Sequence, residues 1–299
     1  MKSGFVAVVG RPNVGKSTLV NRMVGSKVSI VSSRPQTTRN AIRGVVHGDG
    51  FQIVLVDTPG LHKPKTELGS RLNSLVYGSL AESDAVLFIV DATMPIGPGD
   101  RLIAQRLVDS NADVLVAVNK VDAASRQQTV AQLVEAAEWP FQHYFPISAV
   151  TGEGVPELVD EIVSRLPEGP QFYPEEMTSD QPEALVIGEI VREKFLDRLR
   201  DELPHALVVR VEDMETRDDG VLDIAADVIV ERPSQKGIVI GRGGSLLKEA
   251  GTEARVELET ILGTGVNLML HVEVEKDWQR SPQLLDRLGF EASDHGETA

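Results

Sequence analysis

The sequence predicts an α/β chain of two domains, the first with a mostly parallel sheet covered by helices on both faces and the second of α+β type. Two observations support this. Five short apolar runs alternate with amphipathic stretches up to about residue 166, and a proline-rich segment then precedes a different order of elements. Apolar runs that alternate with helices are typical of parallel strands buried on both faces.

In the first half, the predicted strands are residues 5–9, 51–56, 85–90, 114–118 and 144–147. The predicted helices cover residues 17–24, 67–81, 100–109, 127–137 and 155–166. Ligands of such sheets bind at the carboxyl ends of the strands. The motifs described below lie at those ends.

Four prolines between residues 167 and 182 interrupt any helical or strand period and predict an ordered linker. We place the first domain at residues 1–168, the linker at 169–183, and the second domain with its C-terminal tail at 184–299. The second domain is expected to follow the order α-β-β-α-α-β. Its predicted elements are a helix at 183–203, strands at 205–211 and 221–230, an apolar turn at 237–240, a helix at 245–262 and a strand at 266–274.

A glycine-rich motif follows the first predicted strand and opens the first predicted helix. Residues 10–17 read GRPNVGKS and fit the phosphate-loop pattern G-x-x-x-x-G-K-[ST]. Its glycines let backbone N–H groups surround phosphates, and the helix N-terminus adds positive potential. We expect Lys16 to reach the β- and γ-phosphates and Ser17 to ligate Mg²⁺, as in a P-loop NTPase. The motif alone leaves ATP and GTP equally open.

Two further segments supply groups for the γ-phosphate and its magnesium ion. In the DTPG motif after the second predicted strand, Asp57 is expected to hold Mg²⁺ through water and Gly60 to donate its N–H to the γ-phosphate. Thr37 and Thr38 lie between the phosphate loop and that strand, where a threonine that senses the γ-phosphate is expected. We favour Thr38 as the Mg²⁺ ligand, with Thr37 as the alternative.

Two more motifs predict selectivity for guanine. NKVD at residues 119–122 ends the fourth predicted strand, and Asp122 can accept hydrogen bonds from N1–H and the exocyclic amine of guanine. Asn119 can bond the opposite edge of the base and tie its loop to the phosphate loop, while the stem of Lys120 covers the base. The SAV segment after the fifth predicted strand contributes the N–H of Ala149, which can bond guanine O6.

The predicted ligands of this site are therefore GTP or GDP and Mg²⁺. We assign Lys16, Thr38 and Gly60 to hydrolysis, and Ser17, Thr38 and Asp57 to the metal ion. The full set of predicted nucleotide contacts is Gly10, Arg11, Pro12, Asn13, Val14, Gly15, Lys16, Ser17, Thr18, Thr37, Thr38, Asp57, Thr58, Pro59, Gly60, Leu61, Asn119, Lys120, Val121, Asp122, Ser148, Ala149 and Val150.

The motifs GRPNVGKS, QTTR, DTPGLHKP and NKVD resemble those of the Era and thiophene-oxidation-GTPase branch of the translation-factor-related GTPases. In the second half, IVIGRGG at residues 238–244 resembles the G-x-x-G loop of a KH domain, and the element order resembles the type II KH domain. The chain thus resembles the Era-like GTPase family over nearly its whole length. The resemblance implies a GTP-hydrolysing switch that binds 16S rRNA near its 3′ end and assists maturation of the 30S subunit.

The resemblance also bears on how GTP is hydrolysed. Leu61 stands where many relatives carry a glutamine that orients water, so slow intrinsic hydrolysis is expected. Related GTPases with an asparagine at the position of Asn13 use potassium, which implies K⁺ beside the phosphates and a catalytic role for Asn13. The alternative is that Asn13 only stiffens the loop by bonding its own backbone.

The G-x-x-G loop is the predicted RNA contact, because such loops clamp backbone nucleotides at their glycines. From Asp180 onward there are about 14 basic and about 26 acidic residues, so we expect a confined basic loop on a repulsive domain. The alternative is that this loop only caps a helix in an acidic interaction domain. The predicted RNA contacts are Lys236, Ile240, Gly241, Arg242, Gly243, Gly244, Lys248 and Arg255.

Composition narrows the functional classes further. The net charge of −15 argues against diffuse binding to nucleic acid, and the absence of cysteine excludes disulfides and thiolate metal sites. We see no leader peptide and expect a soluble cytoplasmic monomer, with peripheral contact to the cytoplasmic face of the cell membrane left open. Two other functions stay as alternatives: an RNA-modification-associated GTPase, and a signalling GTPase whose KH-like domain binds protein.

Overall fold

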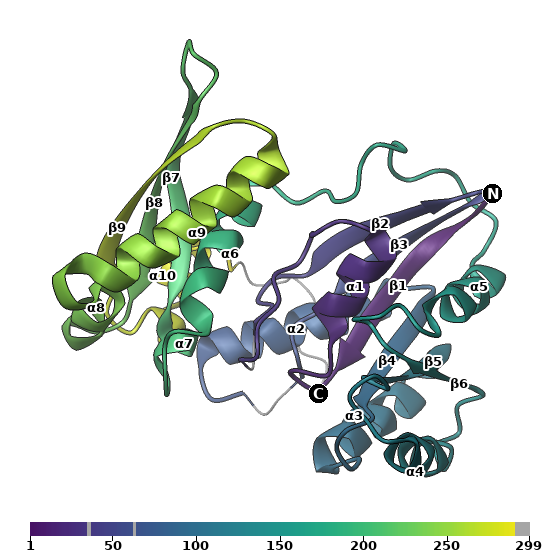
Figure 1. Cartoon of the computed structure of the whole chain (residues 1–299). Helices are drawn as coiled ribbons and strands as arrows, with labels where there is room; N and C mark the ends of the chain where they lie inside the picture. Colours follow the sequence, from purple (N-terminus) through teal and green to yellow (C-terminus); the bar gives the residue numbers. More distant parts are fainter. Residues whose placement is uncertain (35–36, 62–63, 291–299) are drawn as a thin grey trace.

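The first sheet has six strands in the order β2-β3-β1-β4-β5-β6, in a computed structural model that describes residues 1–34, 37–61 and 64–290 (Figure 1). All neighbours pair in parallel except β2 and β3. The strands are β1 (Lys2–Gly10), β2 (Ile42–Gly48), β3 (Phe51–Asp57), β4 (Ala85–Asp91), β5 (Val114–Asn119) and β6 (His143–Ile147). The helices are α1 (Lys16–Val24), α2 (Glu67–Ala81), α3 (Pro98–Asp109), α4 (Arg126–Ala136) and α5 (Val155–Arg165).

Helices cover both faces of this sheet, as the continuous apolar strands predict. Side chains alternate along a strand, so Val6 and Val8 of β1 belong to the core with α1 and α5. Ala7 and Val9 belong to the opposite core, which is shared with α2, α3 and α4. The predicted α/β class with a mostly parallel sheet is confirmed.

Strand β2 was not predicted from the sequence. Its sequence, IRGVVHG, is interrupted by glycine, arginine and histidine, and it lies at the antiparallel edge of the sheet, so it lacks a continuous apolar run. The segment between α5 and the second unit runs beside β2 and also contacts β3. Val45 N–H donates to Thr178 O at 2.8 Å, and the Gln52 side chain accepts from Phe172 N–H at 2.8 Å.

The second unit has a three-stranded sheet, β7-β8-β9, in which β7 and β8 are antiparallel and β8 and β9 parallel. Its order contains the predicted α-β-β-α-α-β pattern. The elements are α6 (Glu183–Leu196), α7 (Leu203–Ala206), β7 (Val208–Thr216), β8 (Leu222–Val230), α8 (Pro233–Ile240), the 3₁₀ turn η1 (Arg242–Gly244), α9 (Ser245–Leu262) and β9 (Val266–Val274).

Three predicted boundaries in this unit were wrong. The strand expected at 205–211 is β7, which runs from Val208 to Thr216, because His205 and Ala206 belong to α7. The helix expected at 183–203 ends at Leu196 and does not continue into α7, because Asp201 between the two helices adopts a positive φ of 54°. Pro204 lies in the first turn of α7, where proline is tolerated. The apolar turn expected at 237–240 is the end of helix α8, which begins at Pro233. Proline is favoured in the first turn of a helix, and this signal was overlooked.

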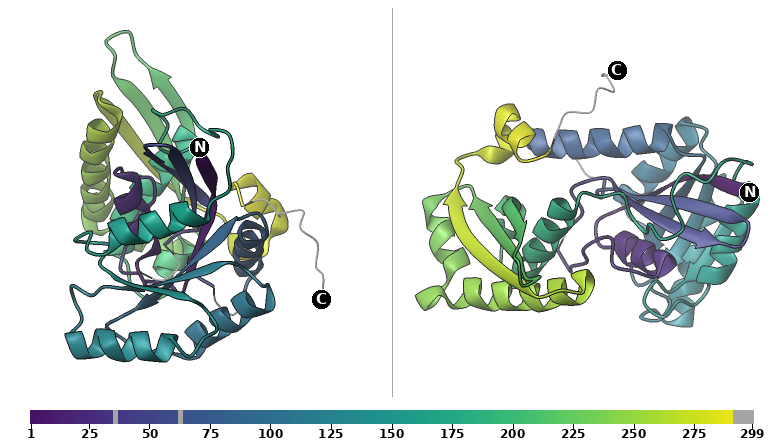
Figure 2. Two further views of the ribbon diagram at one scale, coloured as in Figure 1. Left: turned by 90° about the vertical axis from the view of Figure 1, so that its right-hand side faces the viewer. Right: turned by 90° about the horizontal axis from the view of Figure 1, so that it is seen from above.

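After β9 the chain returns to the first unit. A 3₁₀ turn, η2 (Trp278–Arg280), and α10 (Pro282–Arg287) pack against α2, and Figure 2 shows α10 at one end of α2. Trp278 is fully buried and donates to Ala206 O at 3.0 Å. In the described part of the chain, no helix combines the length and apolar character needed to cross a membrane.

The loop between α1 and β2 connects the two units through Arg39. This side chain is 2% exposed and lies 5.8 Å from the ring centroid of Trp278. Its guanidinium donates to the carbonyl oxygens of Leu207 at 2.7 Å, His205 at 2.8 Å and Pro204 at 3.1 Å. The residue after the predicted switch threonine is therefore anchored in the second unit.

Two more cations of this loop contact the second unit. Lys27 forms salt bridges with Glu193 of α6 and Glu257 of α9. Arg34 donates to the Leu199 carbonyl at 2.7 Å. Because three basic side chains of one loop make these contacts, the position of that loop depends on the second unit.

Candidate guanine-nucleotide site and RNA groove

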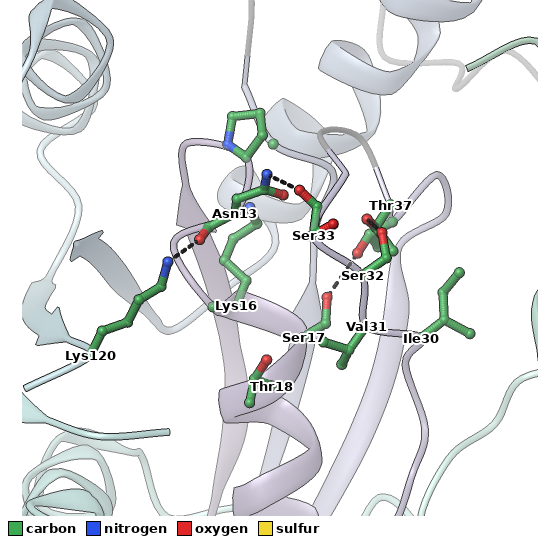
Figure 3. Close-up of a pocket in the computed structure, with 14 residues that line it drawn as sticks. Asn13, Lys16, Ser17, Thr18, Ile30, Val31, Ser32, Ser33, Thr37 and Lys120 are labelled. Carbon is green, nitrogen blue, oxygen red and sulfur yellow. Dashed lines mark hydrogen bonds between the residues drawn. The ribbon is translucent and has the colours of Figure 1, made fainter. Parts of the chain in front are cut away.

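The phosphate loop encloses a cavity of ≈ 470 Å³ at the carboxyl ends of the strands. Backbone geometry explains its shape: Gly15 has φ of 100°, and a Cβ there would lie 2.3 Å from Asn119 Nδ2. Figure 3 shows the lining side chains converging on this space. They come from Pro12, Asn13, Gly15, Lys16, Ser17, Thr18, Ile30, Val31, Ser32, Ser33, Thr37, Thr38, Gly60 and Lys120.

Lys16 lies at the bottom of the phosphate loop and is 6% exposed. Its ammonium donates to the carbonyl oxygens of Arg11 at 3.0 Å and Gly10 at 3.2 Å. Burial lowers the pKa of Lys16 to about 8, against the opposing attraction of Asp57. A buried ammonium whose neighbours are neutral carbonyls and one acid is a strong hydrogen-bond donor to phosphate oxygens.

Three oxygen-bearing side chains meet beside Lys16. Ser17 Oγ lies 2.9 Å from Thr38 Oγ1, which donates to Asp57 Oδ2 at 3.4 Å. Asp57 is fully buried, and burial raises the pKa of its carboxyl although Lys16 and nearby hydroxyls oppose the shift. Among the described residues, Asp57 Oδ1 has no hydrogen-bond partner. Hydroxyl and carboxylate oxygens with one orphaned oxygen fit a hard cation such as Mg²⁺.

The two candidate threonines differ in what they contact. Thr38 is 5% exposed and faces Ser17 and Asp57. Thr37 Oγ1 donates to the Arg34 carbonyl at 2.7 Å, within its own loop. The geometry therefore favours Thr38 over Thr37 as the metal ligand. Gln36 of the QTTR motif and His62 and Lys63 of DTPGLHKP lie outside the described residues.

At the guanine end, Asn119 connects two loops. Its Nδ2 donates to Val14 O at 2.8 Å, and its Oδ1 accepts from Ala149 N–H at 2.9 Å. The sequence predicts that Ala149 N–H bonds guanine O6. In the structure this N–H instead donates to the side chain of Asn119. Asp122 is held by a hydrogen bond of 2.6 Å from Ser148 Oγ to its Oδ1.

The remaining predicted contacts belong to the same loops. Thr58 is buried and donates to Val8 O at 2.8 Å, and Val121 N–H donates to Ile147 O at 3.2 Å. Leu61 is 9% exposed and packs in the core with α2, α3 and α4, so its side chain cannot orient water in the cavity. Val150 differs from Leu61 in that its residue surface is 60% exposed to solvent.

Two acids that support the site were missed by the sequence analysis. Asp91 ends β4 and accepts from Lys120 Nζ at 2.6 Å, and the fully buried Asp100 accepts from Arg11 Nε at 2.8 Å. Asp91 comes at the end of an apolar strand, as Asp57 does. That position could have identified Asp91 as a candidate site residue from the sequence. Asp100 offered no comparable signal, because its partner is distant in the sequence.

The G-x-x-G loop forms the turn between α8 and α9. Gly241 has φ of 75°, and a Cβ there would lie 2.8 Å from Leu246 N, so this turn requires glycine. A groove of ≈ 320 Å³ opens beside it, between α9 and β9. The groove is lined by Gly244, Leu247, Lys248, Gly251, Thr252, Arg255, Leu268 and Leu270.

This lining includes only part of the predicted RNA set. Gly244, Lys248 and Arg255 line the groove, whereas Ile240 packs against the core of the second unit. The other members, Lys236, Gly241, Arg242 and Gly243, lie outside the lining. The apolar floor was missed because Leu268 and Leu270 resemble ordinary alternating residues of a strand.

Two acidic residues of α9 pair with basic side chains outside this groove, whereas Glu259 pairs with the groove-lining Arg255 at 2.7 Å. Glu257 pairs with Lys27 and Lys194, and Glu253 with Arg198. Burial favours protonation of Glu257, but the hydrogen bonds from the two lysines outweigh it and lower the pKa. The negative charges of Glu253 and Glu257 are therefore balanced by basic side chains within the protein.

Outside these sites, the described residues contain one group of potential metal ligands on β8 and β9. Ligand atoms of Asp227, His271 and Glu273 lie within 4.8 Å of one another. Arg210 Nη2 also lies 3.9 Å from Asp227 Oδ2, so the group is part of an exposed ion-pair network. We assign no metal ion to it.

Family models match both units. A family described as 50S ribosome-binding GTPase matches residues 5–120, and the KH domain family matches residues 202–279. The GTPase Era of Mycobacterium bovis (strain BCG / Pasteur 1173P2) is 50% identical over 295 residues, which cover 96% of this chain and 98% of that protein. The GTPase Era of Mycobacterium sp. (strain KMS) is also 50% identical, with 97% and 99% covered.

Solved structures agree with this relationship. An Aquifex aeolicus Era variant bound to GDP·AlF4⁻ has a TM-score of 0.93 and 40% identity, and covers 97% of this chain and 100% of its own. Era in complex with MgGDPNP and nucleotides 1506–1542 of 16S ribosomal RNA has the same TM-score and identity, with 97% and 99% covered. With its guanine-nucleotide loops on the first sheet and a KH domain after them, the chain belongs to the Era family of GTPases.

Proposed function

We propose that this GTPase is a molecular switch that binds 16S rRNA near its 3′ end and assists assembly of the 30S ribosomal subunit. The observation that carries the proposal is the presence in one chain of a guanine-nucleotide cavity and a G-x-x-G groove, joined by the loop that bears Thr38. The similar Era structure holds MgGDPNP and nucleotides 1506–1542 of 16S rRNA. The broader family description names the 50S subunit, but the relative at 40% identity is the more specific guide.

In this proposal the nucleotide roles follow the side-chain geometry. Lys16 binds the β- and γ-phosphates, and Gly60 donates its backbone N–H to the γ-phosphate. Ser17 and Thr38 ligate Mg²⁺, and Asp57 holds it through water; the ion neutralises charge on the phosphate oxygens. Asp122 accepts from the guanine edge in the orientation set by Ser148. The other phosphate-loop and guanine-loop residues supply backbone contacts.

The RNA strand is proposed to lie in the groove between α9 and β9. Backbone phosphates approach the glycine turn and the positive charge of Lys248, while Arg255 lies along the groove in a salt bridge with Glu259. Bases contact the apolar floor of Leu268 and Leu270. This combination of a basic rim and an apolar floor favours RNA over a protein partner, which separates the proposal from a signalling GTPase.

The test is filter binding of an oligonucleotide with the sequence of nucleotides 1506–1542 of 16S rRNA. The double variant Gly241→Asp, Gly244→Asp is expected to lose binding, because side chains and negative charge block the phosphate approach, while its GTP hydrolysis without RNA stays nearly unchanged. The matched control is Gly220→Asp, which also has positive φ and has nothing within 4 Å of an added Cβ. Unchanged RNA affinity in the double variant would contradict the assignment of the groove.

A potassium ion beside the phosphates is the finer part of the cofactor proposal. Asn13 has φ of 67°, and its Nδ2 donates to the Ser33 carbonyl at 2.7 Å rather than to its own backbone (Figure 3). This contact supports a site where the Asn13 amide and a loop carbonyl approach the phosphates from one side. A fixed cation there stabilises the charge that spreads over the phosphate oxygens in the transition state.

Steady-state GTP hydrolysis in matched KCl and NaCl tests the potassium site. Wild type is expected to be faster in KCl, and Asn13→Ala to lose that stimulation. Equal wild-type rates in the two salts would remove the ion, and stimulation that survives in Asn13→Ala would remove this residue as its ligand. A monomeric state, a cytoplasmic location and peripheral membrane contact stay predictions from the sequence.

A further inference from the structure

Lys120, the lysine of NKVD, has an unusual backbone conformation and two partners. Its φ is 71°, a region that residues other than glycine and asparagine rarely adopt, so surrounding contacts must hold it. Its ammonium donates to Asn13 O and to Asp91 Oδ2, at 2.6 Å in both cases. One of these partners belongs to the phosphate loop and the other to the end of β4.

Asp91 is held in place independently of that lysine. The residue is 6% exposed, and its Oδ1 accepts from Thr93 N–H at 2.9 Å and Thr93 Oγ1 at 2.6 Å. Burial alone would raise the pKa of Asp91, but hydrogen bonds from Lys120 and Thr93 outweigh it and hold the pKa below its usual value. The carboxylate is therefore ionised at neutral pH and has one oxygen free for Lys120.

Sheet register explains why these residues meet. Asp91 and Asn119 are paired across β4 and β5, and Ala92 N–H donates to Asn119 O at 2.8 Å. Lys120 follows Asn119 directly, so its side chain starts beside the Asp91 carboxylate. Strand pairing, rather than a mobile surface contact, sets the distance between the two groups.

We propose that Asp91 is a positioning residue for nucleotide binding, which acts by holding Lys120 between the guanine base and the phosphate loop. The inference rests on the proposed base contact of Lys120. Lys120 donates both to Asp91 and to Asn13 O. Figure 3 shows the contact between Lys120 and Asn13 and the next one, from the Asn13 amide to the Ser33 carbonyl. One buried carboxylate thus orients the cover of the base and also the phosphate-loop residue that contacts the Ser33 loop.

Removal of this carboxylate is expected to act on nucleotide retention. Asp91→Asn keeps the size of the side chain and an oxygen for Thr93, but it removes the charge that holds the ammonium. The rate of release of a fluorescent GDP analogue, measured by stopped-flow displacement with excess GDP, is expected to rise about tenfold. The matched control is Asp84→Asn, directly before β4 at its other end, where Asp84 Oδ2 accepts from Phe5 N–H at 2.8 Å. Its release rate is expected to stay at the wild-type value.

A double-mutant cycle separates positioning from general stabilisation. If Asp91 acts through Lys120, Asp91→Asn adds nothing to the release rate in a Lys120→Met background. Full additivity of the two changes, or a release rate in Asp91→Asn within twofold of wild type, would overturn the inference.

Failure of the proposed base site has a different signature, because selectivity depends on Asp122. The ratio of GDP to xanthosine diphosphate affinity is expected to be unchanged in Asp91→Asn and inverted in Asp122→Asn. If Asp122→Asn inverts the ratio while Asp91→Asn leaves release unchanged, only the positioning role is lost. If neither variant changes binding, the proposed base site itself is wrong.

Discussion

Replacement of Arg39 by methionine tests whether the two units are held together through the loop that bears Thr38. Methionine keeps much of the stem that packs near Trp278, but it removes the guanidinium. The carbonyl oxygens of Pro204, His205 and Leu207 then lose a charged donor at 2.7–3.1 Å. The surrounding residues stay the same, so the change isolates these three hydrogen bonds and the cation–π contact.

The magnitude follows from opposing contributions. A hydrogen bond to a charged group contributes roughly 1.5–3 kcal/mol, and the cation–π contact adds about 1 kcal/mol. The cost of burying the cation offsets part of this, since burial and the neighbouring Arg192 lower the pKa of Arg39. Leaving buried carbonyl oxygens without a donor typically costs about 1–3 kcal/mol, and the upper value corresponds to a change of roughly 100-fold in the docking equilibrium of the two units.

Amide hydrogen exchange followed by mass spectrometry measures this equilibrium. Peptides from the Thr38 loop and from α7 are expected to exchange up to about 100-fold faster in Arg39→Met, while peptides from β4 and β5 stay unchanged. The matched control is Arg200→Met, the same change at an exposed position four residues from Pro204. Exchange within threefold of wild type in Arg39→Met would refute the view that this side chain anchors the loop.

Three further outcomes are expected. Asp122→Asn should lose about 100-fold in GTP affinity and prefer xanthosine triphosphate, because Ser148 can still orient the side chain; competition binding that keeps the GTP preference would contradict this. GDP binding should raise the pKa of Lys16 above its value of about 8, so the affinity should fall as pH rises through 8. Calorimetry in buffers of different ionisation enthalpy should then show uptake of about half a proton at pH 8 and almost none at pH 6.5. Trp278→Ala should lower the free energy of unfolding by about 3–5 kcal/mol in urea titration, because it empties a fully buried site and leaves Ala206 O without its donor; a loss under 1 kcal/mol would show that the tail does not support the core.

The local motifs were readable because their geometry is set by contiguous residues. The phosphate loop is a turn between a strand and a helix, and its glycines stand at the positions where positive φ or close approach is required. The turn that contains Gly241 is equally local. Strand β2 was not readable, because its polar and glycine residues are tolerated only at a sheet edge, where one side of the strand lacks a neighbouring strand.

Contacts between distant side chains could not be predicted from the sequence, because they depend on which strands become neighbours in the sheet. The order β2-β3-β1-β4-β5-β6 brings Asp91 beside Asn119 and Lys120, and no spacing in the sequence contains that information. The choice between Thr37 and Thr38 likewise depended on which hydroxyl faces Asp57. The sequence alone indicated that Leu61 cannot orient water. That its side chain packs into the core with α2, α3 and α4 is visible only in the structure.

The sequence by itself determined that this protein has a guanine-nucleotide domain followed by a KH domain, because each motif is a short segment whose chemistry needs only its own residues. Only the tertiary structure decided how the two are connected. Arg39 and Lys27 of one loop reach Leu207 and Glu257 of the other unit, across more than 160 residues of sequence in each case. Those contacts exist because folding places the loop against the second unit, where Arg39 is buried and Lys27 partly buried. A cation removed from water there needs oxygen partners.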